Sequence, residues 1–258
     1  MKPYDRAFYF DQQGGSRMSA KEIVPIILNL VKPKSVIDVG CGLGTWLSVF
    51  AEHGIQELRG IDGEWVNKKL LQIPENCFSS YDLTKPVRIN RKFDLVVSLE
   101  VAEHIPSQFA EVFIQSLVSL GPIILFSAAI PNQGGVNHVN EQWPNYWTEL
   151  FGKRDYVVVD FIRRKIWQNV RIEPWYAQNI LIFVKHSSLE KYPLIKDEFE
   201  RGANTEQLSI VHPKVYLNVL SDAARKLTLM QLVKLLLNKP KILLNKKPKE
   251  HLGFPKSG

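Results

Sequence analysis

Three glycines follow a short run of β-branched residues near the start of the chain. Gly40, Gly42 and Gly44 lie in the segment VIDVGCGLGT. Glycine lets a chain turn sharply and approach a ligand closely because it has no Cβ. A dinucleotide-binding fingerprint would need a further glycine at the position of Thr45, and a phosphate-binding loop would continue into Gly-Lys-Ser/Thr. The loop therefore favours a nucleoside ligand other than NAD.

An acidic residue closes the next predicted strand. Asp62 lies 18 positions after Gly44 and precedes Gly63. A carboxylate at this place can accept hydrogen bonds from both hydroxyls of a ribose that lies across the strand ends. The alternative is a plain turn, since Asp-Gly is a common turn dipeptide. Asp82 and Leu83 follow a weaker third strand, where contact with an adenine or a surface turn would explain them equally well.

A third group of polar residues follows the strand in FDLVVSLEVAEHIP (residues 93–106). Glu100 lies at its carboxyl end, which is where ligands bind in open α/β sheets. Glu103 and His104 come next. A direct catalytic role for this pair competes with helix capping by solvated charges.

The loop GGVNHVNEQW (residues 134–143) follows the next predicted strand. An unperturbed histidine titrates near neutral pH, so His138 is our candidate general base, with His104 second and Glu141 beside them. We expect no metal site, because a set made of His138, Asn140 and Glu141 lacks a second cluster of ligands. Trp143, Tyr146 and Trp147 offer flat faces to a sugar or a sulfonium, or else form the buried stripe of a helix.

The spacing of apolar residues predicts the elements that must position these groups. Short β-branched runs alternate with amphipathic stretches, as in βαβ units. We predict strands over residues 35–40, 57–61, 77–80, 93–99, 122–126, 156–163 and 179–185. We predict helices over residues 20–31, 45–52, 107–117, 144–152 and 222–238. The expected organisation is an N-terminal cap (1–19), an α/β domain (20–186) and a basic, partly helical C-terminal extension (187–258).

The bulk composition narrows the class of protein. Two cysteines among 258 residues exclude a disulfide framework. Residues 221–258 hold nine of the 33 Lys and Arg but two of the 26 Asp and Glu, so the rest of the chain has 24 of each and no net charge. We therefore expect no nucleic-acid partner. Since the N-terminus has no apolar core of a signal peptide, we expect a cytoplasmic protein.

Together the four segments resemble class I S-adenosylmethionine (SAM)-dependent methyltransferases. The resemblance spans about residues 20–185 and implies a Rossmann-like, seven-stranded sheet with helices on both faces and an antiparallel last strand. It implies that SAM is the cofactor, that the three glycines line its methionine end, that Asp62 holds its ribose, and that Asp82 and Leu83 flank its adenine. The other expected cofactor contacts are Asp38, Cys41, Trp46, Gly63 and Glu100.

A narrower resemblance concerns the methyl acceptor. The segments KPKSVIDVGCGLGTWL, NHVNEQWPNYWTELF and VRIEPWYAQN are similar to bacterial methyltransferases associated with surface-polysaccharide and other glycan synthesis. This resemblance implies O-methylation of a hydroxyl on a sugar, glycan or related metabolite. The alternatives are an NAD-dependent oxidoreductase and a non-catalytic subunit with the same fold.

The C-terminal helix adds a possible partner. Ala223, Leu227, Met230, Val233 and Leu237 recur at helical spacing, and a run of lysines follows them. A basic amphipathic helix can lie in the headgroup region of an anionic membrane, here the inner face of the cell membrane. A helix docked on the parent domain or on a second subunit would show the same stripe.

Overall fold

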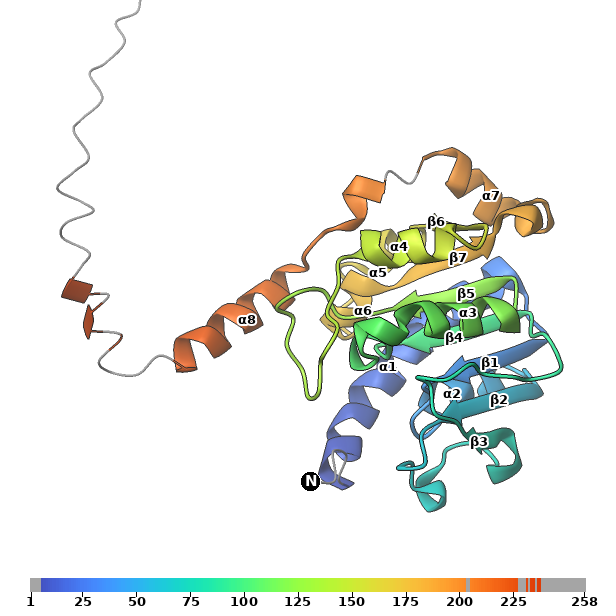
Figure 1. The fold of residues 1–258 in the computed structure, drawn as a ribbon, viewed down its shortest axis with the longest axis horizontal. Helices are drawn as coiled ribbons and strands as arrows, with labels where there is room; N and C mark the ends of the chain where they lie inside the picture. The colour runs from blue at the N-terminus through green and yellow to red at the C-terminus, as the bar shows by residue number, and fades with distance from the viewer. Residues whose placement is uncertain (1–5, 203–204, 227–230, 232, 235, 238–258) are drawn as a thin grey trace, which may run out of the picture. The chain divides into compact units, whose positions relative to one another are not determined.

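A computed structural model describes residues 6–202, 205–226, 231, 233–234 and 236–237 of the chain. A seven-stranded sheet forms its centre, with strand order β3-β2-β1-β4-β5-β7-β6 (Figure 1). Strands β1 to β5 pair in parallel, and β7 is antiparallel to both β5 and β6. The strands are β1 (Ser35–Val39), β2 (Glu57–Asp62), β3 (Phe78–Ser80), β4 (Leu95–Leu99), β5 (Ile123–Ser127), β6 (Tyr156–Val159) and β7 (Leu181–Lys185). The expected sheet with one antiparallel strand is confirmed.

Alternate residues of each central strand enter two separate cores, because successive side chains of a strand point to opposite faces. Ile123 and Leu125 of β5 join the first core, whereas Ile124 and Phe126 join the second. The first core lies under α1 (Arg6–Val31), α2 (Thr45–Glu52), α5 (Ile162–Ile166) and α6 (Pro174–Asn179). The second lies under α3 (Ala110–Leu120) and α4 (Pro144–Gly152). Helices therefore cover both faces of the sheet, as expected.

The strand order reverses between β1 and β4. In open α/β sheets such a switch point opens a crevice beyond the carboxyl ends of the strands, and ligands bind there. The glycine loop after β1, Asp62 at the end of β2 and Glu100 after β4 all lie at this edge. The topology therefore gathers the residues that the sequence singled out.

The N-terminal residues form part of a helix. Helix α1 begins at Arg6 and runs without a break to Val31, so the predicted boundary between residues 19 and 20 falls inside it. The hydroxyl of Ser19 donates to the carbonyl of Gly15 at 2.8 Å, and Arg17 contacts Ser48 and Glu52 of α2. The Ser19 bond lies within α1, and the Arg17 contacts join the middle of α1 to α2.

The strand predicted over residues 156–163 is too long. Strand β6 ends at Val159, and Ile162 and Arg163 begin α5. The reason is Arg163, whose side chain is buried and forms a two-pronged ion pair with Asp160, at 2.9 and 2.7 Å. That i,i+3 spacing suits a helical turn rather than a strand. Strand β7 likewise begins at Leu181, because Pro174 starts α6 just before it.

The C-terminal extension predicted from residue 187 divides into two parts. Residues 1–216 form one compact unit and residues 217–258 another. Within the first unit, α7 (Pro193–Glu200) packs on β6, and Ile195 and Leu208 are buried in the two cores. Helix α8 (Pro213–Lys226) starts before the predicted position 222, because Pro213 supplies a favourable first helical residue.

The second unit holds all of the amphipathic helix predicted over residues 222–238. Residues 227–230, 232, 235 and 238–258, with all of the lysine run that follows Leu237, lie outside the described residues. Among the helices that the structure describes, none combines the length and apolar character that crossing a bilayer would require.

Candidate functional site

The glycine loop adopts backbone conformations that favour glycine. Gly40, Gly42 and Gly44 have φ angles of 84°, 54° and 78°. A Cβ at Gly40 would lie 2.4 Å from the side chain of Val101, so this position has no room for one. A Cβ at Gly42 would meet no protein atom within 4 Å, so that α-carbon faces open space. The loop is tight on one side and accessible on the other, as a cofactor cradle requires.

Asp62 fastens the loop to the end of β2. Its carboxylate is buried and accepts the backbone N–H of Gly42 at 2.7 Å and that of Gly63 at 2.6 Å. Burial raises the pKa of Asp62, and these two hydrogen bonds oppose the rise. Each carboxylate oxygen accepts one such bond and keeps capacity for another donor. The pair of ribose hydroxyls expected from the sequence fits that capacity.

The other expected cofactor residues of this loop lie around the same edge. Asp38 is buried in β1, and its burial, followed by the charge of Asp62, raises its pKa well above the ordinary value. Cys41 is buried and its thiol contacts the carbonyl of Gly42 at 3.6 Å. The ring of Trp46 meets that of Tyr176 edge to face at 5.2 Å. These side chains come from β1, the glycine loop, α2 and α6, and their contact with the cofactor stays a prediction.

Asp82 and Leu83 lie in different surroundings. The Asp82 carboxylate accepts the N–H and hydroxyl of Thr84 at 3.0 and 2.6 Å and pairs with Lys85 at 3.1 Å. Its side chain is half exposed. Leu83 is buried in the second core. The surface-turn interpretation therefore describes the contacts of Asp82, and adenine contact by this pair stays a prediction.

We expect Asp62→Ala to weaken SAM binding roughly 10- to 150-fold, because the ribose would lose hydrogen bonds to a charged group worth about 1.5–3 kcal/mol. Isothermal titration calorimetry measures the effect. Asp62→Asn, which keeps one oxygen acceptor for the loop, separates loss of charge from loss of loop geometry. Asp197→Ala is the matched control. Asp197 is exposed on α7, and α7 packs on β6, the edge strand at the other end of the sheet from β2 and β3. Equal affinities of Asp62→Ala and wild type would rule out the ribose role.

Glu100 begins the second half of the site. It has a left-handed backbone, with φ of 54°, and its N–H donates to the carbonyl and the hydroxyl of Ser127 on β5. Its carboxylate accepts the side-chain amides of Asn179 and Gln133, both at 3.1 Å. Burial raises the pKa of Glu100, and these hydrogen bonds oppose the rise. Glu100 is therefore held firmly between the ends of β4 and β5.

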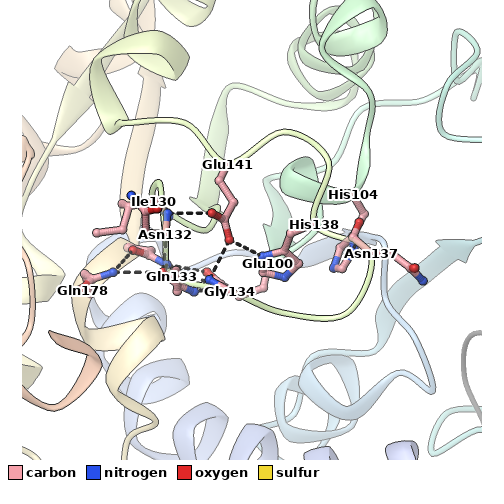
Figure 2. A network of polar contacts seen from close by, with 11 residues as sticks. Glu100, His104, Ile130, Asn132, Gln133, Gly134, Asn137, His138, Glu141 and Gln178 are labelled. Atoms are coloured by element: carbon pink, nitrogen blue, oxygen red, sulfur yellow. Dashed lines mark hydrogen bonds and ion pairs between the residues drawn. The ribbon is translucent and has the colours of Figure 1, made fainter. Parts of the chain in front are cut away.

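His138 and Glu141 form a pair in the loop after β5. Nδ1 of His138 lies 2.9 Å from a Glu141 oxygen, and this carboxylate also accepts the N–H groups of Asn132 and Gly134, both at 2.8 Å (Figure 2). Because a carboxylate only accepts, Nδ1 carries the proton. A Cβ at Gly135 would lie 2.2 Å from Nε2 of His138, so glycine makes room for the ring. The imidazole is thus fixed in both tautomer and orientation.

His104 and Glu103 adjoin this pair. The ring of His104 meets that of His138 edge to face at 4.9 Å, and its Nδ1 donates to the carbonyl of Asn137 at 3.3 Å. Burial and the neighbouring His138 lower the pKa of His104. Glu103 is completely buried, and neither of its carboxylate oxygens has a hydrogen-bond partner among the described residues. The interpretation of Glu103 as a solvated helix cap is therefore wrong.

The aromatic residues of the loop and α4 separate into two groups. Trp147 is buried against Phe126 and Tyr146 packs on it, so these two belong to the inner stripe of α4. Trp143 is 41% exposed. Among these three residues, Trp143 offers the flat face that a sugar ring could use.

Three amide side chains of the site were not identified from the sequence. Gln178 donates to Gln133 at 3.0 Å (Figure 2), and Asn179 donates to Gln133 at 2.9 Å and to Glu100. Gln178 and Asn179 are buried at the end of α6. Amides carry no charge pattern. The only signal for Gln178 and Asn179 was their place at the start of the strand predicted over residues 179–185, and Gln133 had no such signal.

Comparisons with known proteins agree with this geometry. Residues 13–168 match the family described as "Methyltransferase domain", which covers more than half of the chain. A search of curated proteins found no match. An O-methyltransferase family protein from Burkholderia thailandensis has a similar fold, with a TM-score of 0.51, 12% identity, and coverage of 71% of this chain and 61% of that one.

Two further solved structures match at lower TM-scores. The methyltransferase domain of bacterial CtHen1 has a TM-score of 0.47 and 18% identity, with coverage of 64% of this chain and 97% of that one. Magnesium protoporphyrin IX methyltransferase from Synechocystis PCC 6803 has a TM-score of 0.48 and 19% identity, with coverage of 66% and 80%.

The family match, the strand order and the cradle around Asp62 lead to one assignment. An oxidoreductase that binds NAD is set aside, because the loop lacks its last glycine and the matched family transfers methyl groups. The open face of Gly42 and the spare acceptor capacity of Asp62 fit the cofactor that the sequence predicts. The chain therefore belongs to the methyltransferase domain family and is a SAM-dependent methyltransferase.

Proposed function

We propose that this methyltransferase acts on a hydroxyl oxygen of a small molecule, and that the acceptor is a sugar, a glycan or a related metabolite. The observation that supports it most strongly is the His138–Glu141 pair at 2.9 Å, in the loop that follows β5. A hydroxyl needs its proton removed as it is methylated. An oriented, neutral imidazole is suited to that task.

The residues of the chain divide the work between donor and acceptor. SAM supplies a methyl group that its positive sulfur already activates, so positioning accounts for much of the acceleration. The glycine loop and Asp62 bind and orient that donor. Glu141 keeps the proton of His138 on Nδ1, which leaves Nε2 to accept the proton of the acceptor hydroxyl. His104, whose ring touches that of His138, is the second candidate for this role.

The sugar part of the proposal is supported by one exposed aromatic ring and by the resemblance of the sequence to methyltransferases of glycan synthesis. Trp143 lies two residues after Glu141 and is 41% exposed. The test is a panel of acceptors with methyl-labelled SAM: sugars, nucleotide sugars, catechols, carboxylates and amines. Transfer to hydroxyl compounds is the expected result. Labelling of amines or carboxylates alone would refute O-methylation, and no transfer to any acceptor would favour a non-catalytic subunit.

We further propose that the second unit binds anionic membrane surfaces. Among its described residues, Leu217, Leu220, Leu236 and Leu237 are between 47% and 70% exposed, and Arg225 and Lys234 lie among them. Each basic residue near an anionic surface contributes about 1 kcal/mol. The full chain should therefore sediment with anionic vesicles and not with neutral ones, whereas a chain that ends at Leu220 should sediment with neither. Equal, negligible sedimentation of both chains with anionic vesicles would leave a docked helix as the explanation.

A further inference from the structure

Three side chains of the site are close enough to share one ligand. A carboxylate oxygen of Glu103 and one ring nitrogen each of His104 and His138 all lie within 4.8 Å of one another. Glu103 and His104 come from the short 3-10 helix after Glu100 (Ala102–His104), and His138 comes from the loop after β5. The backbone joins the two segments, since the carbonyl of Glu103 accepts the N–H groups of Val139 and Asn140 at 2.9 and 3.0 Å. The cluster is therefore held together independently of its side chains.

The Glu103 carboxylate needs a partner that the described protein residues do not provide. Its side chain is 0% exposed, and both oxygens lack a hydrogen-bond donor among the described residues. An ionised carboxylate in such a place is costly unless it is paired or coordinates a metal. The backbone N–H groups of Glu103 and Ala129 lie near it, and the two imidazole rings are the side chains with which it forms the cluster. The carboxylate is thus aimed at two nitrogen ligands, and it must bind either a proton or a cation.

In both histidines Nδ1 makes a hydrogen bond, which leaves Nε2 for a cation. Nδ1 of His138 donates to Glu141, and Nδ1 of His104 donates to the carbonyl of Asn137. Nε2 is therefore the unprotonated nitrogen of each neutral ring. Histidines that bind metals commonly donate their other N–H to a carboxylate or a backbone carbonyl in this manner. The second carboxylate of the site, Glu100, adds negative charge next to Glu103.

We propose that Glu103, His104 and His138 bind one divalent first-row transition-metal ion. Two imidazoles and one carboxylate form a ligand set that suits Mn²⁺, Fe²⁺ or Zn²⁺ and leaves coordination positions open. The set of His138, Asn140 and Glu141 considered from the sequence shares only His138 with this one. Glu141 is the hydrogen-bond partner of His138, and Glu103 and His104 complete the ligand set.

This inference rests on the proposed function for its chemical use. With an ion bound, Nε2 of His138 would be a ligand and no longer the base of the proposed function. The cation would instead lower the pKa of the bound acceptor hydroxyl, and the hydroxyl proton would pass to water. The new C–O bond forms as the C–S bond of the donor breaks, and the electron pair of that bond stays on sulfur. The products are the methyl ether, S-adenosylhomocysteine and one proton.

The test measures metal binding directly, without an acceptor. Chelator-treated, full-length protein is titrated with Mn²⁺ and, separately, with Zn²⁺ by calorimetry. We expect one ion per chain, and we expect Glu103→Gln to weaken binding at least tenfold, since a neutral amide replaces the charged ligand. Glu149→Gln, at an exposed position of α4, is the matched control and should bind like wild type. The same ions should raise the melting temperature of wild type but not that of Glu103→Gln.

Two results would overturn the proposal. One is binding of neither ion to wild type at millimolar concentration, which would mean that Glu103 carries a proton. The other is equal binding by wild type and Glu103→Gln, which would place the ion elsewhere. A SAM titration on each protein shows whether it is folded. The acceptor panel tests the proposed function separately, so metal binding without hydroxyl methylation would refute only the latter.

Discussion

Replacing His138 with alanine should lower turnover by about two to four orders of magnitude while SAM affinity stays within a factor of about two. The large loss is expected in either role of His138, because a positioned proton acceptor contributes typically 10²–10⁴-fold and a missing ligand would weaken the binding of a cation that activates the hydroxyl. The small change in affinity is expected because His138 lies in the loop after β5, whereas we propose that the donor binds at the glycine loop after β1. Turnover is measured with labelled SAM on the best acceptor of the panel, and affinity by calorimetry.

His186→Ala provides the control for this prediction. His186 is exposed and follows β7, whose antiparallel course places it at the opposite edge of the sheet. Its replacement should leave turnover unchanged. Glu141→Gln should reduce turnover less than His138→Ala, since the amide still fills the space but no longer fixes the tautomer through its charge. Unchanged turnover in His138→Ala would make this histidine a structural residue and remove the main support for O-methylation.

Replacing Arg163 with methionine should destabilise the fold by about 3–5 kcal/mol. The guanidinium is buried, pairs with Asp160, and donates to the carbonyls of Gln178 and Leu208 at 3.0 and 2.8 Å. Methionine fills a similar space but leaves a nearly buried carboxylate and two carbonyls without their donor. Removing one partner of a buried ion pair typically costs this amount. Urea unfolding monitored by circular dichroism measures the change.

The neighbouring Arg164 offers a control of the same residue type. It is 62% exposed and pairs with Glu198 at 3.0 Å, so Arg164→Met should cost less than about 1 kcal/mol. Similar unfolding midpoints for Arg163→Met and wild type would show that the buried ion pair contributes nothing net. Since Arg163 holds the carbonyl of Gln178, we also expect its loss to loosen the amides around Glu100.

Local patterns in the sequence were sufficient to predict the elements around the glycine loop. Helix α2 begins at Thr45 and ends at Glu52, as predicted, because the glycine loop before it and the turn after it are both encoded nearby. The alternation of strands and helices predicted the sheet for the same reason. Asp62 could be singled out because it ends a strand whose position follows from that alternation.

The burial of Glu103 and Arg163 could not be predicted from the sequence, because it depends on contacts with segments that are distant along the chain. Glu103 looked like a solvated charge, but Val101, Ala102 and Ile105 are all buried and draw the carboxylate inward with them. The apolar run after Tyr156 looked like one long strand, but the buried partners of Arg163 come from α6 and from residue 208. Contacts between segments 15 and 45 residues apart leave no periodic signal in the sequence.

The amide groups behind Glu100 form a chain of hydrogen bonds with a single direction. The N–H of His212 donates to the oxygen of Gln178, the nitrogen of Gln178 donates to the oxygen of Gln133, and the nitrogen of Gln133 donates to Glu100. If the side-chain amide of Gln133 rotated by 180°, its nitrogen would face the donor nitrogen of Gln178 and its oxygen would face the carboxylate of Glu100. This series of hydrogen bonds therefore fixes the orientation of each amide and keeps Glu100 in the role of acceptor. Its first donor is the backbone N–H of His212, directly before the start of α8. The geometry of the catalytic edge thus depends on residues far beyond the last strand of the sheet.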